Sequence, residues 1–156
     1  MEISKATYNE FLSYWRDADW ARPQFGAYFL RDEMEFWYAK VNDTVVGRIY
    51  FFKNLSDPDI ANGYSRGYIC NLHVLREYRG HGIGTALIEA IKNRAKEISF
   101  THVTLGVDEQ ELANVRLYHR LGFTEKIKEC HSDPVCRNAD GNYEDNHFTL
   151  ISCTIL

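Results

Sequence analysis

The sequence predicts an α+β fold in which helices flank a mixed, mostly antiparallel sheet. Apolar segments of strand length follow one another through polar turns in the first and last thirds of the 156-residue chain, as antiparallel strands do. Between them lies a strand–turn–helix–strand–helix unit, which typically brings parallel pairing into a sheet. Because the length suits one ordinary domain and neither a repeat nor a linker divides the chain, we expect a single domain over residues 1–156.

The N-terminal third is expected to hold two helices followed by two strands. Phe11 and Trp15 recur at helical spacing. Asn42-Asp43 is a turn signal between two strand-like segments, and Gly47 indicates a bulge or a close backbone approach. Most aromatic residues here are expected to be core. The expected elements are a strand at 1–4, helices at 8–17 and 24–31, strands at 35–41 and 45–52, and an exposed loop at 53–66.

A glycine-rich turn between a strand and a helix occupies the middle of the chain. Residues 68–75 are apolar enough for a strand buried on both faces, and apolar residues recur at helical spacing over residues 87–98. Gly80, Gly82 and Gly84 let the intervening backbone turn sharply and approach a ligand closely. Because a helix N-terminus presents unpaired N–H groups and a partial positive charge, we expect this turn to bind a phosphate group.

The last third is expected to begin with a strand and a helix and to end with two strands. A strand at 102–107 is followed by Asp108, a suitable helix cap, and the next helix ends at Gly122, which suits a C-terminal cap. The final strands are expected at 124–130 and 147–155, with a long polar loop between them.

Composition excludes several classes of function. The net charge is −4 and no basic arm is present, so no nucleic-acid partner is expected. No apolar run approaches the ~18 residues of a membrane span, and the N-terminus lacks signal-peptide features, so we expect a cytoplasmic protein without a membrane partner. Reduced thiols are the simplest state for the four cysteines. The Cys130-x5-Cys136 spacing fits no common zinc site, so no metal is expected.

The spacing of the residues in this turn excludes two common phosphate-binding motifs and fits a third. A P-loop needs Lys and then Ser or Thr after its last glycine, whereas Thr85-Ala86 follows Gly84. A dinucleotide fingerprint needs G-x-G-x-x-G, which neither Gly80 nor Gly82 begins. The pattern that fits is Arg79-x-x-Gly82-x-Gly84, with Arg79 adding a fork of donors for phosphate oxygens. This signature resembles that of the GNAT superfamily of acyl-CoA-dependent N-acetyltransferases.

A second segment strengthens the resemblance. Leu117-Tyr118 followed by Leu121-Gly122-Phe123 is similar to the superfamily's second signature, in which a helix carries a tyrosine near the thioester sulfur. The two signatures in this order, with strands on either side, are much rarer than either one. The resemblance covers residues 68–123 and implies a GNAT-type fold, acetyl-CoA as cofactor and N-acetyltransferase activity.

The resemblance also implies roles for individual residues. Pantetheine would add like a strand beside Leu72 and Val74, and the backbone N–H of Leu72 would stabilise the oxyanion by ~3 kcal/mol. Tyr118 would protonate the departing CoA thiolate. Glu111 replaces a common asparagine, and Asn114 lies nearby but one turn late. The implied cofactor-binding residues are Leu72, His73, Val74, Arg79, Gly80, His81, Gly82, Ile83, Gly84, Thr85, Asn114 and Tyr118.

The general base is where the sequence departs from the family pattern. Family members often carry glutamate or histidine at positions matching Tyr68 and Cys70, and strand alternation is expected to place His73 on the opposite face from Cys70. The amine then binds already neutral, or its proton leaves through water to Glu35, Asp108, Glu109 or Glu111. The residues considered for the acceptor pocket are Tyr14, Trp20, Phe25, Tyr28, Glu35, Tyr68 and Cys70.

Together these features predict transfer of the acetyl group of acetyl-CoA to a primary amine of a small molecule, by direct attack in a ternary complex. The aromatic first helices and the long loop after Cys130 suit a covering over a compact pocket. A protein N-terminus or a lysine is the alternative acceptor and requires an open groove. Because the side-chain base is missing, a non-catalytic acyl-CoA sensor on the same fold is the alternative from another class. A homodimer is compatible with the sequence.

Overall fold

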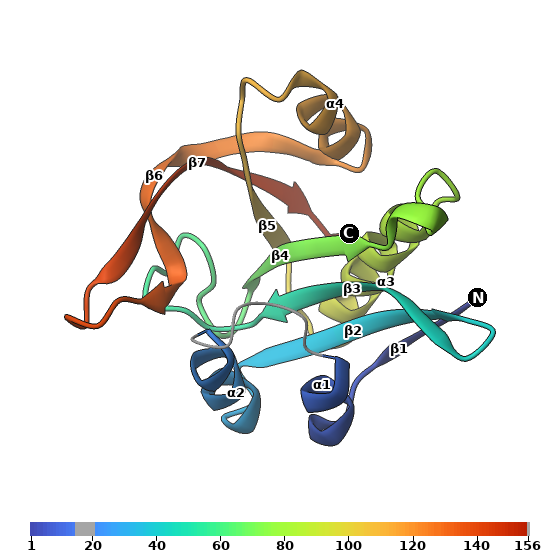
Figure 1. Cartoon of the computed structure of the whole chain (residues 1–156). Coiled ribbons are helices and arrows are strands. Elements are labelled where there is room, and N and C mark those ends of the chain that lie inside the picture. The colour runs from blue at the N-terminus through green and yellow to red at the C-terminus, as the bar shows by residue number, and fades with distance from the viewer. Residues whose placement is uncertain (15–20, 156) are drawn as a thin grey trace.

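The computed structural model describes residues 1–14 and 21–155 (Figure 1). Its strands are β1 (Glu2–Lys5), β2 (Met34–Val41), β3 (Thr44–Phe52), β4 (Arg66–Val74), β5 (His102–Val107), β6 (Phe123–Arg137) and β7 (Tyr143–Thr154). Its helices are α1 (Tyr8–Tyr14), α2 (Arg22–Leu30), α3 (Ile83–Glu97) and α4 (Leu112–Arg120), with a single 3₁₀ turn at Arg76–Tyr78. This is the α+β element order that the sequence predicts.

The strands form one mixed, mostly antiparallel sheet in the order β1-β2-β3-β4-β5-β7-β6. Its one parallel pair among the described strands is β4 with β5, and their register extends only from Arg66 opposite His102 to Tyr68 opposite Thr104. Beyond Tyr68 the two strands separate, as Figure 1 shows. The sheet therefore opens in its middle, and the edge of β4 that faces β5 is left without a backbone partner from β5 there.

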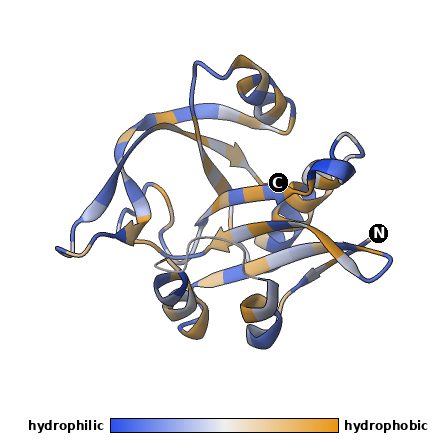
Figure 2. Cartoon of the chain, in the orientation of Figure 1, coloured by the Kyte–Doolittle hydropathy of each residue, from blue (hydrophilic) through white to orange (hydrophobic). Residues whose placement is uncertain are grey.

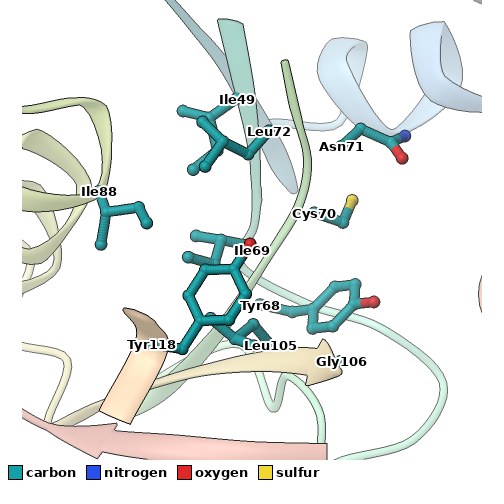
Figure 3. A pocket seen from close by; sticks show the side chains of 10 residues that line it. All are labelled: Ile49, Tyr68, Ile69, Cys70, Asn71, Leu72, Ile88, Leu105, Gly106 and Tyr118. Atoms are coloured by element: carbon teal, nitrogen blue, oxygen red, sulfur yellow. The ribbon is translucent and has the colours of Figure 1, made fainter. Parts of the chain in front are cut away.

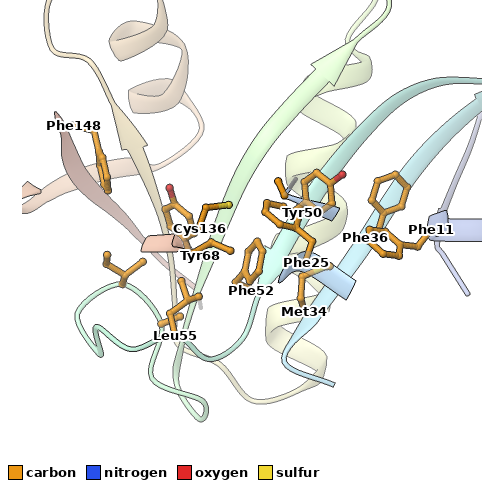
Figure 4. Packing of buried hydrophobic residues seen from close by; sticks show 14 of the residues in the cluster. Phe11, Phe25, Met34, Phe36, Tyr50, Phe52, Leu55, Tyr68, Cys136 and Phe148 are labelled. Atoms are coloured by element: carbon orange, nitrogen blue, oxygen red, sulfur yellow. The ribbon is translucent and has the colours of Figure 1, made fainter. Parts of the chain in front are cut away.

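Helices cover both faces of the sheet, and the side chains buried on the two faces differ in type. Helices α1 and α2 lie on one face, and α3 lies on the other (Figure 1). The first face is packed with aromatic rings; Phe25, for example, meets Tyr50 edge-on with ring centroids 5.0 Å apart (Figure 4). The second core is mainly aliphatic and includes Ile49, Leu87, Ile88, Ile91 and Val103. The hydropathy colouring shows the apolar strand β3 between these layers and a hydrophilic tip on the β6–β7 hairpin (Figure 2).

Gly47 lies where helix α3 packs against the sheet. A Cβ atom at this position would lie 3.1 Å from Ile83 and 3.2 Å from Leu87. The register between β2 and β3 also shifts here, because Ala39 faces Gly47 and Lys40 faces Val45. Both features predicted for Gly47, a close approach and a neighbouring bulge, are therefore confirmed.

A second bulge, in β4, changes which side chains share a face. Cys70 lies opposite Tyr50, and His73 lies opposite Arg48, so β4 takes three steps where β3 takes two. Asn71 absorbs the extra residue with a φ of 52°, the left-handed conformation that Asn tolerates better than most residues. Because Arg48 and Tyr50 are two apart on one strand, their partners Cys70 and His73 share a face. The expectation that His73 faces away from Cys70 is wrong.

The two final strands are longer than predicted. The segment expected as a polar loop continues the β6–β7 hairpin, and the turn is confined to Asn138–Asn142, where the Asn138 N–H donates to the Asn142 carbonyl over 2.7 Å. Val135 and Cys136 are buried in the aromatic core, and this packing stabilises β6 despite its irregular register. Helix α1 is described only to Tyr14, so the predicted extension through Trp15 lies outside the described residues.

No helix among residues 1–14 and 21–155 is long and apolar enough to cross a membrane. In the same part of the chain, no three His, Cys, Asp or Glu side chains are grouped so that they could hold a metal ion.

Candidate active site

The glycine-rich turn follows β4 and leads directly into helix α3. Gly80 and Gly82 have φ values of 80° and 81°, a left-handed conformation that is unfavourable for most other residues. No side chain caps the first turn of α3, and a Cβ at Gly80 or Gly82 would meet nothing within 4 Å. The Arg79 Nε donates to the carbonyl of Val74 over 2.8 Å, which fixes this side chain across the turn. The start of α3 therefore borders a space that no side chain fills.

A cavity of about 460 Å³ lies between this turn, the end of β4 and helix α4. It is lined by every residue of the predicted cofactor-binding set except His81. It also includes Tyr78, Ile88, Leu117 and Leu121, which the sequence analysis did not assign to the site. The helical spacing of Leu117 and Leu121 around Tyr118 is a signal that could have identified two of them. Asn114 is exposed, and its side-chain amide donates to Glu111 over 2.6 Å.

A second cavity of about 200 Å³ adjoins the first, and Figure 3 shows the residues that line it. The two cavities share Leu72, Ile88 and Tyr118, so these residues mark their junction. In Figure 3 the Tyr118 hydroxyl points toward β4, whereas the Tyr68 hydroxyl points away from it. Burial raises the pKa of Tyr118, and Glu111 adds to the effect, so this phenol keeps its proton at neutral pH. The remaining lining residues are Ile49, Tyr68, Ile69, Cys70, Asn71, Leu105 and Gly106.

The bulge at Asn71 places the backbone of β4 at this junction. Because the strand changes sides there, Leu72 and Val74 pack against the aliphatic core, next to Gly84 of helix α3. The edge of β4 past Tyr68 has no partner in β5, so its backbone groups border the opening. A ligand that adds like a strand along this edge would run from the start of α3 to Tyr118.

Several residues considered for the acceptor pocket lie elsewhere. Phe25 is buried in the aromatic core, and Tyr28 packs edge-on against Phe52. Tyr14 stacks edge-on against Tyr38 and lines a small separate hollow beside His73. Of this group, Tyr68 and Cys70 line the second cavity. Trp20 lies outside the described residues.

Glu35 belongs to an ion-pair network and lines neither cavity. Its carboxylate accepts hydrogen bonds from Arg94 at 2.8 and 3.1 Å and from Trp37 at 3.0 Å, and it pairs with Lys53 at 3.3 Å. Burial alone raises the pKa of this carboxyl, but the hydrogen bonds from Arg94 and Trp37 and the charge of Lys53 outweigh it, so the pKa lies below its ordinary value. The structure thus corrects the expectation of an acceptor-side role, because strand alternation turns Glu35 toward α3.

The other three carboxylates considered as bases lie between β5 and α4, outside both cavities. Asp108 accepts a hydrogen bond from the backbone N–H of Gln110, and Glu109 pairs with Lys126 at 3.1 Å. Glu111 accepts the hydrogen bond from Asn114 already described. Each therefore has a local contact that explains its position.

A set of side-chain contacts joins helix α2 to the end of β6. Gln24 accepts a hydrogen bond from the backbone N–H of Arg137 at 2.7 Å and donates to its carbonyl at 3.2 Å. Arg137 in turn lies over the ring of Tyr143, 4.2 Å from its centroid, and the Tyr143 hydroxyl hydrogen-bonds to Ser56. We call these contacts of Gln24, Ser56, Arg137 and Tyr143 the α2–β6 clasp. The clasp closes the gap between α2 and the hairpin.

Comparisons with known proteins match this chain to one family and to several relatives. Residues 2–123 match the sequence profile of the Acetyltransferase (GNAT) family. The chain is 32% identical over 117 residues to an uncharacterized N-acetyltransferase of Methanocaldococcus jannaschii, covering 72% of this chain and 49% of that protein. It is 35% identical over 100 residues to an N-alpha-acetyltransferase of Sulfurisphaera tokodaii, covering 60% and 58%, and 32% identical over 98 residues to N-alpha-acetyltransferase 30 of Schizosaccharomyces pombe, covering 62% of each. The chain thus spans about half to three fifths of these relatives.

Solved structures share the fold at lower sequence identity. A GNAT family acetyltransferase from Elizabethkingia anophelis with acetyl-CoA bound superposes with a TM-score of 0.66 at 17% identity, covering 98% of this chain and 97% of that one. An aminoglycoside 6'-N-acetyltransferase complexed with coenzyme A gives a TM-score of 0.66 at 17% identity, covering 100% and 98%. This likeness supports the α+β architecture with its opened sheet.

Proposed function

This chain belongs to the GNAT family of acetyltransferases, and on that premise we propose that it transfers the acetyl group of acetyl-CoA to a primary amine of a small molecule. The single observation that supports this most is the pair of adjoining cavities with the Tyr118 hydroxyl at their junction. The larger cavity begins at a phosphate-type turn, and the smaller one adjoins it at Leu72, Ile88 and Tyr118. This arrangement suits two substrates that meet in a ternary complex.

The larger cavity suits coenzyme A. The N–H groups from Gly80 to Thr85 would hold the pyrophosphate, since anions bind well at a helix N-terminus. The pantetheine arm would pair with the free edge of β4 at Leu72 and Val74, which requires only backbone donors and acceptors. The apolar side chains of Ile88 and Leu117 would cover it. The thioester would then lie at the junction with the second cavity.

The reaction we propose is direct attack without an acyl-enzyme. The amine nitrogen bonds to the thioester carbonyl carbon, and the Leu72 N–H stabilises the oxyanion, an interaction worth ~3 kcal/mol. The C–S bond then breaks, and the Tyr118 hydroxyl gives its proton to the sulfur. The nitrogen releases one proton, and Tyr118 regains one from water, so that the products are an amide and the CoA thiol. The raised pKa of Tyr118 suits a group that must be protonated before each turnover.

The α2–β6 clasp supports a compact acceptor. An extended peptide that crossed between α2 and the hairpin would have to break the two hydrogen bonds of Gln24. The cavity next to Tyr118 holds only about 200 Å³, which suits a small molecule or the end of a chain. A protein N-terminus is the second candidate acceptor, and the presence of N-alpha-acetyltransferases among the relatives favours it.

Thermal unfolding followed by turnover tests this function. Acetyl-CoA at 100 times its Kd should stabilise the protein by ~2.7 kcal/mol, which raises Tm by roughly 5–11 °C, while NAD and ATP should leave Tm unchanged. Release of the CoA thiol is then measured with small primary amines and with short peptides that have free N-termini. Thiol release with the small amines supports the proposal, and release with peptides alone selects the second candidate. Binding without any release identifies a non-catalytic acyl-CoA sensor, and no rise in Tm contradicts all three.

A further inference from the structure

The cavity beyond Tyr118 offers the acceptor a particular set of polar groups. They are the phenols of Tyr68 and Tyr118, the thiol of Cys70 and the amide of Asn71. The other described lining residues, from β3, β5 and α3 as well as β4, are aliphatic or glycine. Hydroxyl and amide groups hydrogen-bond a neutral amine well, but they do not neutralise an ammonium ion.

The Tyr68 phenol is held in its neutral form. It is 6% exposed, and burial raises its pKa well above the ordinary value, with Cys70, Asp133 and Cys130 adding to the effect. Asp133 itself is engaged by the backbone, because one carboxylate oxygen accepts hydrogen bonds from the N–H groups of Val135 at 2.8 Å and Cys136 at 2.7 Å. This carboxylate therefore makes ionisation of the phenol harder, and Tyr68 is a poor proton acceptor.

The groups that ordinarily take a proton from an amine are positioned away from this cavity. Because of the bulge at Asn71, His73 pairs with the buried cation Arg48 on β3, and it does not line this cavity. Glu35 lines neither cavity and is held by Arg94, and Asp108, Glu109 and Glu111 lie between β5 and α4 with the local partners already described. Among the residues lining the cavity in the described chain, the acceptor therefore meets no carboxylate or imidazole.

We propose that the acceptor enters this cavity as the neutral free base, and that the enzyme is consequently selective for weakly basic amines, those with an electron-withdrawing group beside the amine, over strongly basic alkyl amines. This inference rests on the proposed function and specifies its substrate class. At pH 7.5 an α-amino group with a pKa near 7.8 is roughly one third neutral, whereas a lysine-type amine with a pKa near 10.4 is about 0.1% neutral. Water, and not a side chain, removes the first proton before binding.

The test is a pH profile with acceptors of equal shape and graded basicity. Ethylamine, 2-fluoroethylamine, 2,2-difluoroethylamine and 2,2,2-trifluoroethylamine are nearly isosteric, and each fluorine lowers the basicity. Thiol release from the full chain is measured at saturating acetyl-CoA between pH 6 and 10, with enzyme-free rates subtracted. We expect log kcat/KM to rise by one per pH unit and to level off at a pH that moves with the acceptor and equals its own pKa.

Three outcomes separate this inference from the proposed function. A break at one fixed pH for all four amines overturns the inference, because a group on the enzyme then accepts the proton. Tyr68→Phe adds a second check: the acceptor-dependent break should survive in this variant, whereas a fixed break in the wild type that disappears in Tyr68→Phe would identify Tyr68 as the titrating group and overturn the inference. If acetyl-CoA raises Tm and yet no amine of any basicity releases thiol, the transferase proposal itself fails, and this inference fails with it.

Discussion

The two adjoining cavities, one proposed for the acetyl donor and one for the acceptor, differ in the groups that form them. Most of the donor cavity comes from one continuous stretch, residues 72–85, and its turn presents backbone N–H groups. The proposed acceptor cavity is assembled from residues of β3, β4, β5, α3 and α4. A backbone site depends on a few glycines and tolerates many side chains, whereas a side-chain site depends on each residue and on the register of the strands. Three substitutions test this difference.

Gly82→Val should have the largest effect, because it acts on the backbone turn itself. Valine is strained at a φ of 81°, and its side chain would occupy the open space in front of the α3 N–H groups. Losing two charge-assisted hydrogen bonds to phosphate, about 3 kcal/mol together, weakens acetyl-CoA binding on the order of 100-fold. Isothermal titration with acetyl-CoA measures the loss.

Gly141→Val is the matched control for this substitution. Gly141 has a φ of 82° and likewise has open space where a Cβ would lie, but it is in the β6–β7 turn. Both variants should lose similar stability, and only Gly82→Val should lose the cofactor. Equal acetyl-CoA affinity in the two folded variants would place the phosphate site elsewhere.

Glu35→Gln should lower the free energy of unfolding without changing the chemistry. The substitution removes the charge between Arg94 and Lys53, and breaking a buried ion pair in this way costs about 3 kcal/mol at pH 7. Because the folded carboxyl has a lowered pKa, its stabilisation is present above the ordinary carboxyl pKa of about 4.3 and is lost as the pH falls through the folded value. The stability gap between variant and wild type should therefore close in acid.

Urea unfolding at several pH values measures this gap, and Glu33→Gln is its control. Glu33 pairs with Arg31 at the surface, so the control should lose less than about 1 kcal/mol. At conditions where Glu35→Gln is fully folded, its kcat should equal that of the wild type. A kcat reduced tenfold in the folded variant would show that Glu35 takes part in the reaction at the acceptor site.

Tyr118→Phe should have the smallest effect of the three, about 10-fold in kcat, because it removes one proton donor and leaves the packing in place. The ring still meets Phe123 edge-on at 6.3 Å, so acetyl-CoA affinity and Tm should change little. Tyr64→Phe, at a tyrosine that is 74% exposed, controls for loss of a phenol elsewhere. Steady-state kinetics at saturating acetyl-CoA measure the change, and an unaltered kcat would remove Tyr118 from the proposed mechanism.

The same difference explains what the sequence could predict. The turn at Gly80–Gly84 and the place of Tyr118 on its helix are local patterns, and the residues they indicate, except His81, line one cavity. The bulge at Asn71 is not a local pattern, because it depends on how β4 pairs with β3. Simple alternation therefore assigned His73 to the wrong face.

Two other errors have the same non-local origin. Glu35 looks like any carboxylate at the start of a strand, and its partner Arg94 lies 59 residues away in the chain. The extension of β6 to Arg137 contains polar residues and Pro134, which normally indicate a loop, yet burial of Val135 and Cys136 in the aromatic core stabilises a strand there. Tertiary packing decides both cases.

The position of β7 between β5 and β6 has a consequence for how the chain is made on the ribosome. All residues that line the donor cavity precede residue 122, and β6 follows them. Strand β6 pairs with β7 alone among the described strands, and β7 is translated after it. A nascent chain therefore carries the whole stretch proposed to bind the cofactor while β6 still emerges as an unpaired edge. Only when β7 is inserted does β6 join the sheet, so the part of the sheet beyond β5 is the last part of the fold to be completed.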